Sequence, residues 1–217
     1  TVFNWTSSVT VGTVTGNTAV GGLGTIADVL VNTTNVIGTV RYVITPVANG
    51  CSGTPFNVDV TVDPQPTLST VVTPLSQVLC SNTAMVIDVN SATVPSAGSV
   101  VYDYVAVASD VSVTGFTASA INQSLATNIS NLNVLNSSLI RQTITYTITP
   151  KVLGGLACAG PSVVVVISID PVPVVSSAAT KSICSGVSVN YVPTAAVAGT
   201  VFNWTSSVTV GTVTGNT

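Results

Sequence analysis

The sequence predicts an all-β protein of sandwich-type domains, and the main observation behind this is the alternation of apolar and polar residues. Ile144, Tyr146 and Ile148 alternate with threonines, which gives a strand with one apolar and one polar face. The same alternation recurs in residues 56–63 and 163–169. These segments are rich in β-branched residues and lie between turn residues, whereas helix signals are almost absent. We therefore expect two packed sheets and negligible helix.

The period of two also predicts which side chains face the core. In the middle of the chain we expect the inward set to be Tyr104, Ile144, Tyr146, Ile148, Val163, Val165 and Ile167. In the earlier strand we expect Val58, Val60 and Val62 to point inward. Trp5 and Tyr104 occupy corresponding positions in their strands, and we interpret both as core anchors rather than sugar-stacking platforms.

A long internal repeat determines how the chain is divided. Residues 1–18 recur unchanged as residues 200–217, so the sequence has a period of 199 residues. The chain contains one full period of 199 residues and the first 18 residues of the next. Because Thr1 is not an initiator residue, we expect the sequence to be an excerpt of a longer protein, with any targeting segment outside it.

A second, fainter repeat divides the period into two related domains. Residues 42–66 and 146–173 share a Tyr-x-Ile-Thr-Pro strand, a cysteine, a valine-rich strand and an Asp-Pro-x-Pro linker. We therefore expect residues 1–65 to be the C-terminal part of one domain, residues 66–171 a complete domain, and residues 172–217 the N-terminal part of the next. Neighbouring copies would supply the strands that the two partial domains lack.

The composition excludes several classes of function. Only 5% of the residues are charged, and the four basic side chains cannot form a phosphate-tracking surface, so we expect no nucleic-acid partner. Without His or Glu, the Ser-His-Asp, Cys-His and usual zinc sites cannot be built. Residues 21–24 are glycine-rich, but neither a helix nor a lysine follows, which favours a loop over a phosphate cradle. We expect no catalysis, no cofactor and no membrane span in this segment.

Each domain carries one early and one late cysteine at matching positions. Cys80 and Cys158 lie in the complete domain, and Cys184 and Cys51 lie in the partial ones. Since the chain has no His and no CxxC spacing, we expect disulfides rather than a metal site. The expected bonds are Cys80–Cys158 within the chain, and Cys51 and Cys184 each with an adjoining repeat copy. The alternative is buried free thiols.

Asp63 and Asp170 recur directly before the two linkers, where calcium could stiffen a joint. A calcium site needs six or more oxygen ligands, usually from several carboxylates. One Asp per junction therefore favours a solvated strand end, with no metal bound. The five Asn-x-Ser/Thr sequons, at Asn4, Asn32, Asn122, Asn128 and Asn136, are expected by chance in so polar a chain.

Residues 24–34 and 42–66 carry the pattern GTIxDxLxNTT followed by YxITP and CSGTPFxVxVTVxPxP. This pattern resembles the PKD-like, immunoglobulin-like tandem repeats of giant cell-surface adhesins in Bacteroidota, whose best-known members are the SprB-like gliding-motility adhesins of flavobacteria. The match returns more loosely over residues 121–173, with extra residues around 131–138. The resemblance implies tandem immunoglobulin-like (PKD-like) β-sandwich domains in an extended filament.

The same resemblance implies a function and a location. It implies an extracellular adhesin, exported by type IX secretion and attached to the outer membrane, that transmits force in gliding motility. The implied partners are neighbouring repeats, a surface polysaccharide or solid substratum, and the surface motility machinery. Two other interpretations stay open: a purely structural filament or stalk, and a carbohydrate-binding accessory module of a secreted enzyme. Very many copies and a distinct terminal domain would favour the adhesin, whereas a neighbouring catalytic domain would favour the accessory module.

Overall fold

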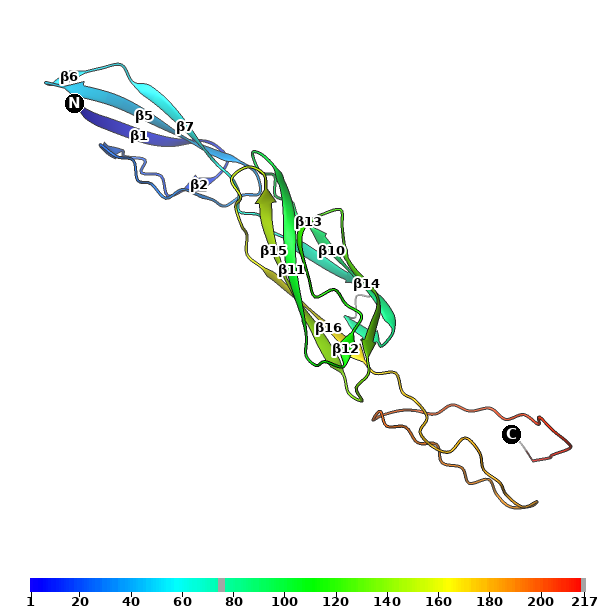
Figure 1. The fold of residues 1–217 in the computed structure, drawn as a ribbon. Coiled ribbons are helices and arrows are strands. Elements are labelled where there is room, and N and C mark those ends of the chain that lie inside the picture. The colour runs from blue at the N-terminus through cyan, green and yellow to red at the C-terminus, as the bar shows by residue number, and fades with distance from the viewer. Residues whose placement is uncertain (74–76, 216–217) are drawn as a thin grey trace.

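The computed structural model describes residues 1–73 and 77–215. Figure 1 shows three parts in a row: an N-terminal part (residues 1–65), a middle domain (residues 66–171) and a C-terminal part (residues 172–215) drawn as loops. Strands and turns make up the regular structure of the described residues, which contain no helix. The prediction of an all-β chain is therefore confirmed.

The middle domain is a sandwich of two sheets, with the strand orders β12-β14-β10-β8 and β13-β11-β15-β16-β9. The first sheet consists of β8 (Ser69–Thr73), β10 (Thr83–Asn90), β12 (Val113–Thr114) and β14 (Ile129–Asn136). The second consists of β9 (Val78–Cys80), β11 (Ser99–Ala108), β13 (Ser119–Ser124), β15 (Gln142–Leu153) and β16 (Val163–Asp170). The short strand β9 runs parallel to β16, whereas β15 pairs with both of its neighbours in the antiparallel sense.

The core of this domain lies between the two sheets. The expected inward set is buried: Ile144, Tyr146, Ile148 and Ile167 are 0% exposed, Val165 is 6% and Tyr104 7% exposed, and Val163 is partly buried. The first sheet contributes Met85, Ile87 and Val89 to the same cluster. Because alternate residues share one face of a strand, burying the apolar face fixes the register of both sheets.

A buried hydrogen bond ties the two sheets together. The Asn131 amide in β14 donates to the Tyr146 hydroxyl in β15 over 2.9 Å, and its own carbonyl oxygen accepts the backbone N–H of Thr117. Burial raises the pKa of Tyr146 above its ordinary value, so this phenol stays neutral. The polar atoms of the pair are thus satisfied inside the core.

The N-terminal part repeats the second sheet of the middle domain and adds a separate two-stranded sheet. Its main strands are β1 (Val2–Val11), β5 (Gly38–Ala48) and β7 (Phe56–Val62), and its short ones are β2 (Val14–Thr15), β3 (Gly22–Leu23), β4 (Val31–Asn32) and β6 (Cys51–Ser52). Strands β1, β3, β5, β6 and β7 form the repeated sheet, while β2 and β4 form the separate one. Trp5 lies opposite Ile44 in this sheet, and Tyr104 lies opposite Ile148 in the other. Sequence positions matched by the fainter repeat therefore occupy the same register.

No described strand of residues 1–65 corresponds to β8 or β10 of the middle domain. The apolar face of β5 and β7 is consequently covered only in part. Trp5, Val40 and Tyr42 are buried, whereas Ile44, Val58 and Val60 are only partly buried. Their counterparts Ile148 and Ile167 in the middle domain reach 0% exposure because a second sheet faces them.

Asp28 fastens the loop before β4 to the N-terminal sheet. Its carboxylate accepts the backbone N–H and the hydroxyl of Thr18 at 2.9 and 2.7 Å, and the hydroxyl of Tyr42 at 2.8 Å. The Thr18 hydroxyl and N–H lower the pKa of Asp28, while burial and the neighbouring carboxylate raise the pKa of Tyr42 to about 12. This triad explains Asp28 in the GTIxDxLxNTT pattern.

The expectation of a loop at residues 21–24 was wrong in one respect. Gly22 and Leu23 form β3, which pairs with Trp5 and Asn4 at the edge of the sheet. A Cβ atom on Gly22 would stand 2.7 Å from Cζ2 of the Trp5 indole. The glycine is thus required for backbone to pass directly over the tryptophan ring.

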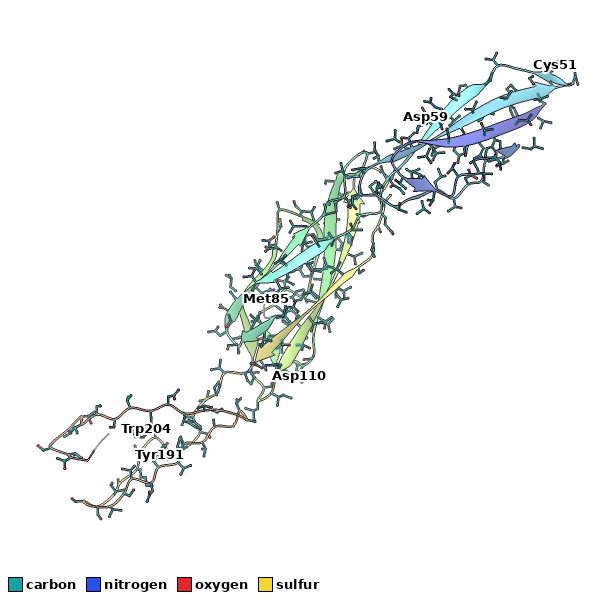
Figure 2. All side chains as sticks on the ribbon, turned by 180° about the vertical axis from the view of Figure 1, so that it is seen from behind. Cys51, Asp59, Met85, Asp110, Tyr191 and Trp204 are labelled. Carbon is teal, nitrogen blue, oxygen red and sulfur yellow. The ribbon has the colours of Figure 1, made fainter. Side chains whose placement is uncertain are left out.

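The C-terminal part begins with residues that correspond to β8–β10, and it contains no strand among its described residues. Residues 200–217 repeat the sequence of residues 1–18, yet the described part of this second copy forms loops, whereas the first copy forms β1. Trp5 is 7% exposed in β1, and the equivalent Trp204 is 71% exposed. Figure 2 shows Trp204 and Tyr191 in this loop segment. The two copies differ in their partners: β1 pairs with β5, whereas the described part of the second copy has no partner strand.

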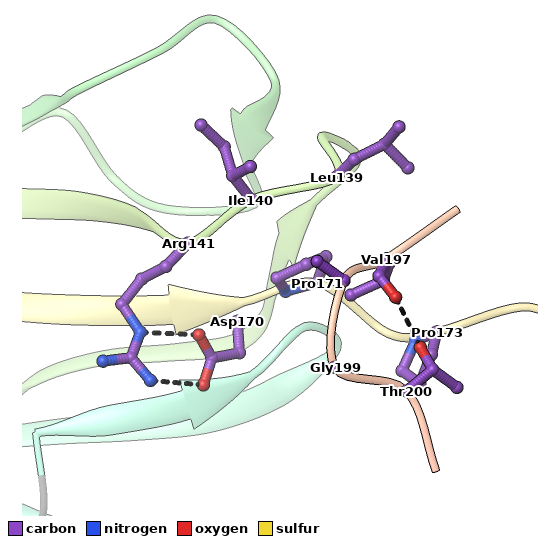
Figure 3. A pocket seen from close by; sticks show the side chains of 10 residues that line it. Leu139, Ile140, Arg141, Asp170, Pro171, Pro173, Val197, Gly199 and Thr200 are labelled. Atoms are coloured by element: carbon purple, nitrogen blue, oxygen red, sulfur yellow. Dashed lines mark hydrogen bonds and ion pairs between the residues drawn. The ribbon is translucent and has the colours of Figure 1, made fainter. Parts of the chain in front are cut away.

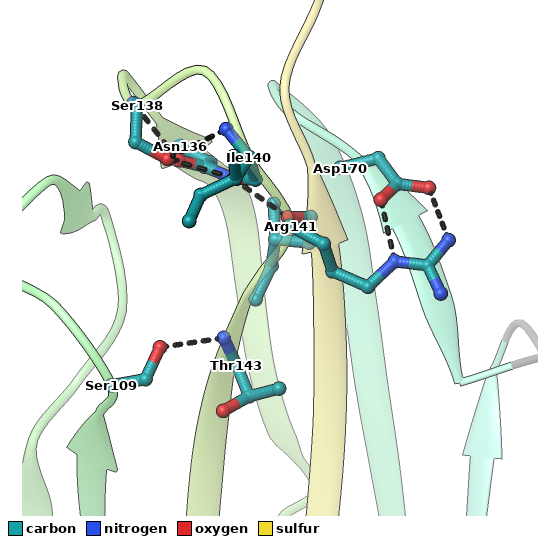
Figure 4. A network of polar contacts seen from close by, with 8 residues as sticks. Ser109, Asn136, Ser138, Ile140, Arg141, Thr143 and Asp170 are labelled. Carbon is teal, nitrogen blue, oxygen red and sulfur yellow. Dashed lines mark hydrogen bonds and ion pairs between the residues drawn. The ribbon is translucent and has the colours of Figure 1, made fainter. Parts of the chain in front are cut away.

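Residues 32–36 and 136–140 form the same turn, which we call the asparagine turn, in the N-terminal part and in the middle domain. In Figure 4, the Asn136 amide donates to the carbonyls of Ile140 and Ile169, each at 2.8 Å, and its oxygen accepts the N–H of Ser138 at 3.0 Å. Asn32 makes the equivalent bonds to Val36 and Val62. Both side chains are buried and fully engaged, which leaves neither amide free to act as a glycan acceptor.

We predict that Asn136→Ala destabilises the middle domain by about 2–3 kcal/mol, because two buried carbonyls lose their donor. Urea unfolding of the full chain measures this effect. Asn133→Ala, an exposed position of the same strand, is the matched control and should change stability little. Equal effects of the two substitutions would contradict the structural role of the turn.

Candidate functional site: the domain junctions

The linker Asp63–Pro66 joins the N-terminal part to the middle domain. Although it has only four residues, Pro64 and Pro66 are buried, whereas Gln65 is exposed. Proline fixes its own backbone angle and restricts the residue before it, so two prolines in four residues leave little conformational freedom. The linker is therefore part of a packed junction.

Three hydrogen bonds hold the junction together. The backbone N–H of Val94 donates to the carbonyl of Asn35 over 2.7 Å, and that of Ser96 donates to the Asp63 carboxylate over 2.9 Å. Gln65 donates from its amide to the carbonyl of Ala159 over 3.2 Å. The asparagine turn of one part thus meets the segment before β11 of the next.

The hairpin after β15 packs directly on the linker. A Cβ atom on Gly160 would lie 1.7 Å from the carbonyl oxygen of Pro66. Gly53, the equivalent residue in the N-terminal part, would meet only Pro46, at 2.9 Å from its Cγ atom. Both glycines lie against a proline, Pro46 of β5 or Pro150 of β15, but only Gly160 also lies against a linker.

The junction after the middle domain uses the corresponding elements. Leu139 and Ile140, which follow the second asparagine turn, face Val197 and Gly199 of the C-terminal part across a cavity of about 460 Å³ (Figure 3). Asp170, at the start of the linker, lines the same cavity. At both ends of the middle domain, the same turn of one unit therefore lies close to the corresponding segment of the next.

The two junction aspartates have partners within the protein. Asp170 forms a two-pronged ion pair with Arg141, with N–O distances of 2.6 and 2.8 Å (Figures 3 and 4). The hydrogen bonds and positive charge of Arg141 lower the pKa of Asp170. Asp63 accepts the Ser96 N–H with Oδ1, while Oδ2 is buried without a hydrogen-bond partner. Each strand end therefore carries a structural bond that the sequence did not predict, although the Asp170 side chain is still 36% exposed.

The calcium alternative gains no support from this arrangement. Both oxygens of Asp170 are taken by the guanidinium group, and Asp63 is the single carboxylate of its junction. Within residues 1–73 and 77–215, no cluster of three or more Asp, Cys, Glu or His residues could hold a metal ion. Calcium prefers several carboxylates and six or more oxygen ligands.

The structure does not bring Cys80 and Cys158, the pair expected to form a disulfide, close together. Cys80 in β9 lies opposite Asp170 in β16, and the neighbouring residue of β16, Ile169, lies opposite Gln142 in β15. The carbonyl of Cys158 instead accepts the N–H of Val152, near the other end of β15. Gln142 and Val152 lie ten residues apart along β15, which corresponds to roughly 33 Å. Disulfide-bonded Cα atoms lie about 4–7 Å apart. Opposite ends of the domain cannot be joined in this way.

The basic side chains are paired one by one. Arg41 binds Asp59 at 2.7 Å, Arg141 binds Asp170 at 2.6 Å, Lys151 binds Asp103 at 2.6 Å, and Lys181 donates to the carbonyl of Asn190 at 2.8 Å. These pairs lie on different strands and loops, so the four cations do not gather into a patch.

Comparison with known proteins identifies the family. The model of the PKD-like domain matches residues 1–66 and 77–173. The chain belongs to the PKD-like domain family. PKD-like domains are typically extracellular modules and generally non-catalytic. No curated protein and no solved structure matches the chain. In the part of the chain that the structure describes, no helix has the length and apolarity needed to span a bilayer.

The sequence located the cysteines and the aspartates of this PKD-like chain but not the junction itself. Trp5 and Tyr104 are buried core residues, as predicted. The partners Asn35, Ser96 and Gly160 were missed, since they lie in loops whose contacts form only between units. The repeated Asn-Thr-Thr and Asn-Ser-Ser triplets, read as chance sequons, were the available signal.

We predict that Gly160→Ala opens the first junction, because the new methyl group collides with the Pro66 carbonyl. Proteinase K should cleave residues 63–67 several-fold faster in this variant, as measured by mass spectrometry of the full chain. Gly53→Ala is the matched control, since it meets Pro46 but no linker. Linker cleavage that is unchanged in Gly160→Ala, or equally accelerated in both variants, would contradict the packed junction.

We predict a pH-dependent loss of stability in Asp170→Asn. The lowered pKa of Asp170 means that the ion pair stabilises the fold at neutral pH and that this contribution is lost as the pH falls below the ordinary value of 3.8. Because the pair is partly exposed, the melting temperature should fall by only about 2 °C at pH 7. The difference from the unsubstituted chain should vanish near pH 2. Asp88→Asn, in β10 away from the linker, controls for the change in charge.

Proposed function

We propose that this PKD-like chain is a repeat segment of a long extracellular filamentous adhesin, which links the cell surface to a substratum and transmits force in gliding motility. The observation that carries the proposal is the use of the same junction elements at both ends of the middle domain. A module that joins its neighbours through opposite ends adds length with every copy. The internal repeat of 199 residues supplies such copies.

Neighbouring copies also complete the two partial domains in this proposal. The N-terminal part lacks counterparts of β8 and β10, and residues 172–199 have the corresponding sequence without forming strands. Ile183, which corresponds to the buried core residue Leu79, is 46% exposed in this isolated position. Joining residues 172–199 to the following copy of residues 1–65 would give both segments the partners they lack.

A load on such a filament passes through every domain in series. Each complete domain resists it through long antiparallel pairs, of which β11–β15 and β15–β16 are the most extensive in the middle domain. The first linker resists bending because its prolines are buried and three hydrogen bonds cross it. These features suit a stiff connector better than a flexible tether.

The carbohydrate-binding alternative would need exposed aromatic residues on a formed surface. Phe3 and Phe56 are exposed on β1 and β7, and Tyr191 and Trp204 are exposed in the C-terminal part. Tyr191 and Trp204 line a cavity of about 780 Å³ (Figure 2). The identical sequence around Trp5 is buried against Tyr42 in the N-terminal part. We interpret the cavity as half of an unfinished core, so it does not favour a sugar site.

Single-molecule pulling on a chain of four periods tests the proposed mechanical role. In reducing buffer we expect each complete domain to open in one cooperative step. Residues 66–171 span about 360 Å when extended at about 3.4 Å per residue. Opening should therefore lengthen the chain by about 320 Å, because the folded domain is about 40 Å long if judged from β15. Opening at forces no higher than those that stretch an unfolded chain would contradict a load-bearing module. The sequence beyond this segment separates the adhesin from a structural stalk, because only an adhesin needs a distinct gripping domain.

A further inference from the structure

We propose that disulfide bonds cross the junctions of the tandem array and join each domain to the next. We call Cys80 and Cys184 the early cysteines, and Cys51 and Cys158 the late cysteines. The early cysteine of one domain pairs with the late cysteine of the domain that follows it. This inference rests on the tandem arrangement of the proposed function, and it replaces the pairing within one domain that the sequence suggested.

The early cysteine lies at the downstream end of its domain. Cys80 ends β9 directly opposite Asp170, the first residue of the outgoing linker, and the N–H of Ser81 donates to the Asp170 carbonyl over 2.8 Å. The thiol is exposed. Cys184 has the same place in the repeat, and it would occupy this position in a domain completed by the next copy.

The late cysteine lies at the upstream end of its domain. Cys158 belongs to the hairpin that packs on the incoming linker, where Ala159 accepts the amide of Gln65 and Gly160 lies against Pro66. Cys51 occupies the equivalent hairpin of the N-terminal part and is exposed. Figure 2 places Cys51 at the outer tip of that part, away from the middle domain. In an array, this tip would face the preceding domain.

The linker is short enough to bring the two thiols together. The early cysteine Cys80 lies opposite Asp170, the first residue of its linker. The two residues that follow the late cysteine Cys158, Ala159 and Gly160, contact Gln65 and Pro66, the last two residues of the other linker. Three residue steps span at most about 10 Å, and a disulfide joins Cα atoms about 4–7 Å apart. The alternative pair within one domain is separated by roughly 33 Å along β15. Geometry thus favours the pair across the junction.

Formation of this bond is a two-electron oxidation by thiol–disulfide exchange. One cysteine thiolate attacks a small disulfide such as oxidised glutathione and expels one glutathione thiolate. The second cysteine thiolate then attacks the mixed disulfide at the protein sulfur and expels the second. The two protein thiols lose two electrons and two protons, and one glutathione disulfide becomes two glutathione molecules.

Such bonds would form a covalent tether along the array. From Cys158 the chain follows β16 and the outgoing linker and reaches Cys184 after 26 residues, a path of at most about 90 Å. This path crosses two domains, each about 40 Å long if judged from the 12 residues of β15. Disulfides at both ends of each such path would leave little slack, so an interior domain could not lengthen under load.

Disulfide mapping on a polypeptide of two successive periods tests the inference. After refolding with oxidised glutathione, peptide mass spectrometry should find Cys80 of the first copy bonded to Cys51 of the second, and Cys184 of the first bonded to Cys158 of the second. Four thiols should remain free. In the 217-residue chain, neither early cysteine is followed by the late cysteine of the next domain. All four thiols should therefore stay reduced in this chain.

Two serine variants of the two-period polypeptide sharpen the test. Cys80→Ser in the first copy should remove one disulfide, whereas Cys158→Ser in the first copy should remove none, because its partner would precede the polypeptide. Pairing within the domain predicts instead that both variants lose the same bond. A Cys80–Cys158 bond, or the absence of any disulfide in the folded oxidised polypeptide, would overturn the inference. Either result would leave the pulling behaviour in reducing buffer, and with it the proposed function, unaffected.

Discussion

A β-strand in this chain forms only where another strand satisfies its backbone. Residues 1–18 and 200–217 share one sequence, and only the first copy contains a long strand, because β5 pairs with β1 along nearly its whole length. Side-chain burial follows backbone pairing, as the exposures of Trp5 and Trp204 show. The alternating pattern therefore specifies which face a strand buries, while the partner decides whether the strand exists.

The same constraint makes the junctions the informative part of the molecule. The middle domain satisfies its own strands in two sheets, so its contacts with neighbours are left to the loops at its two ends. The asparagine turns are held by their own side-chain hydrogen bonds, and the linker prolines fix their own backbone angles. Joining rigid pieces costs little conformational entropy, which suits a module that must repeat in a row.

The fold could be predicted from the sequence because alternation is local. Tyr104, Ile144, Tyr146 and Ile148 were placed in the core from period two alone, and they are buried. The cysteine pairing could not be predicted in this way. Matching positions in two domains identified the early and late cysteines, but only the parallel pairing of β9 with β16 shows that Cys80 and Cys158 lie at opposite ends. Likewise, the bonds of Asp63 and Asp170 depend on Ser96 and Arg141, which are distant in sequence.

In the proposed array, one junction geometry repeats from unit to unit and makes the filament straight and stiff. Small-angle X-ray scattering on reduced polypeptides of one, two and three periods tests it most directly. If the account is right, the maximum dimension rises by the same increment with each added period, at about 80 Å for two domains of the length of β15. An increment that shrinks with each period, as expected for domains on flexible linkers, would contradict it.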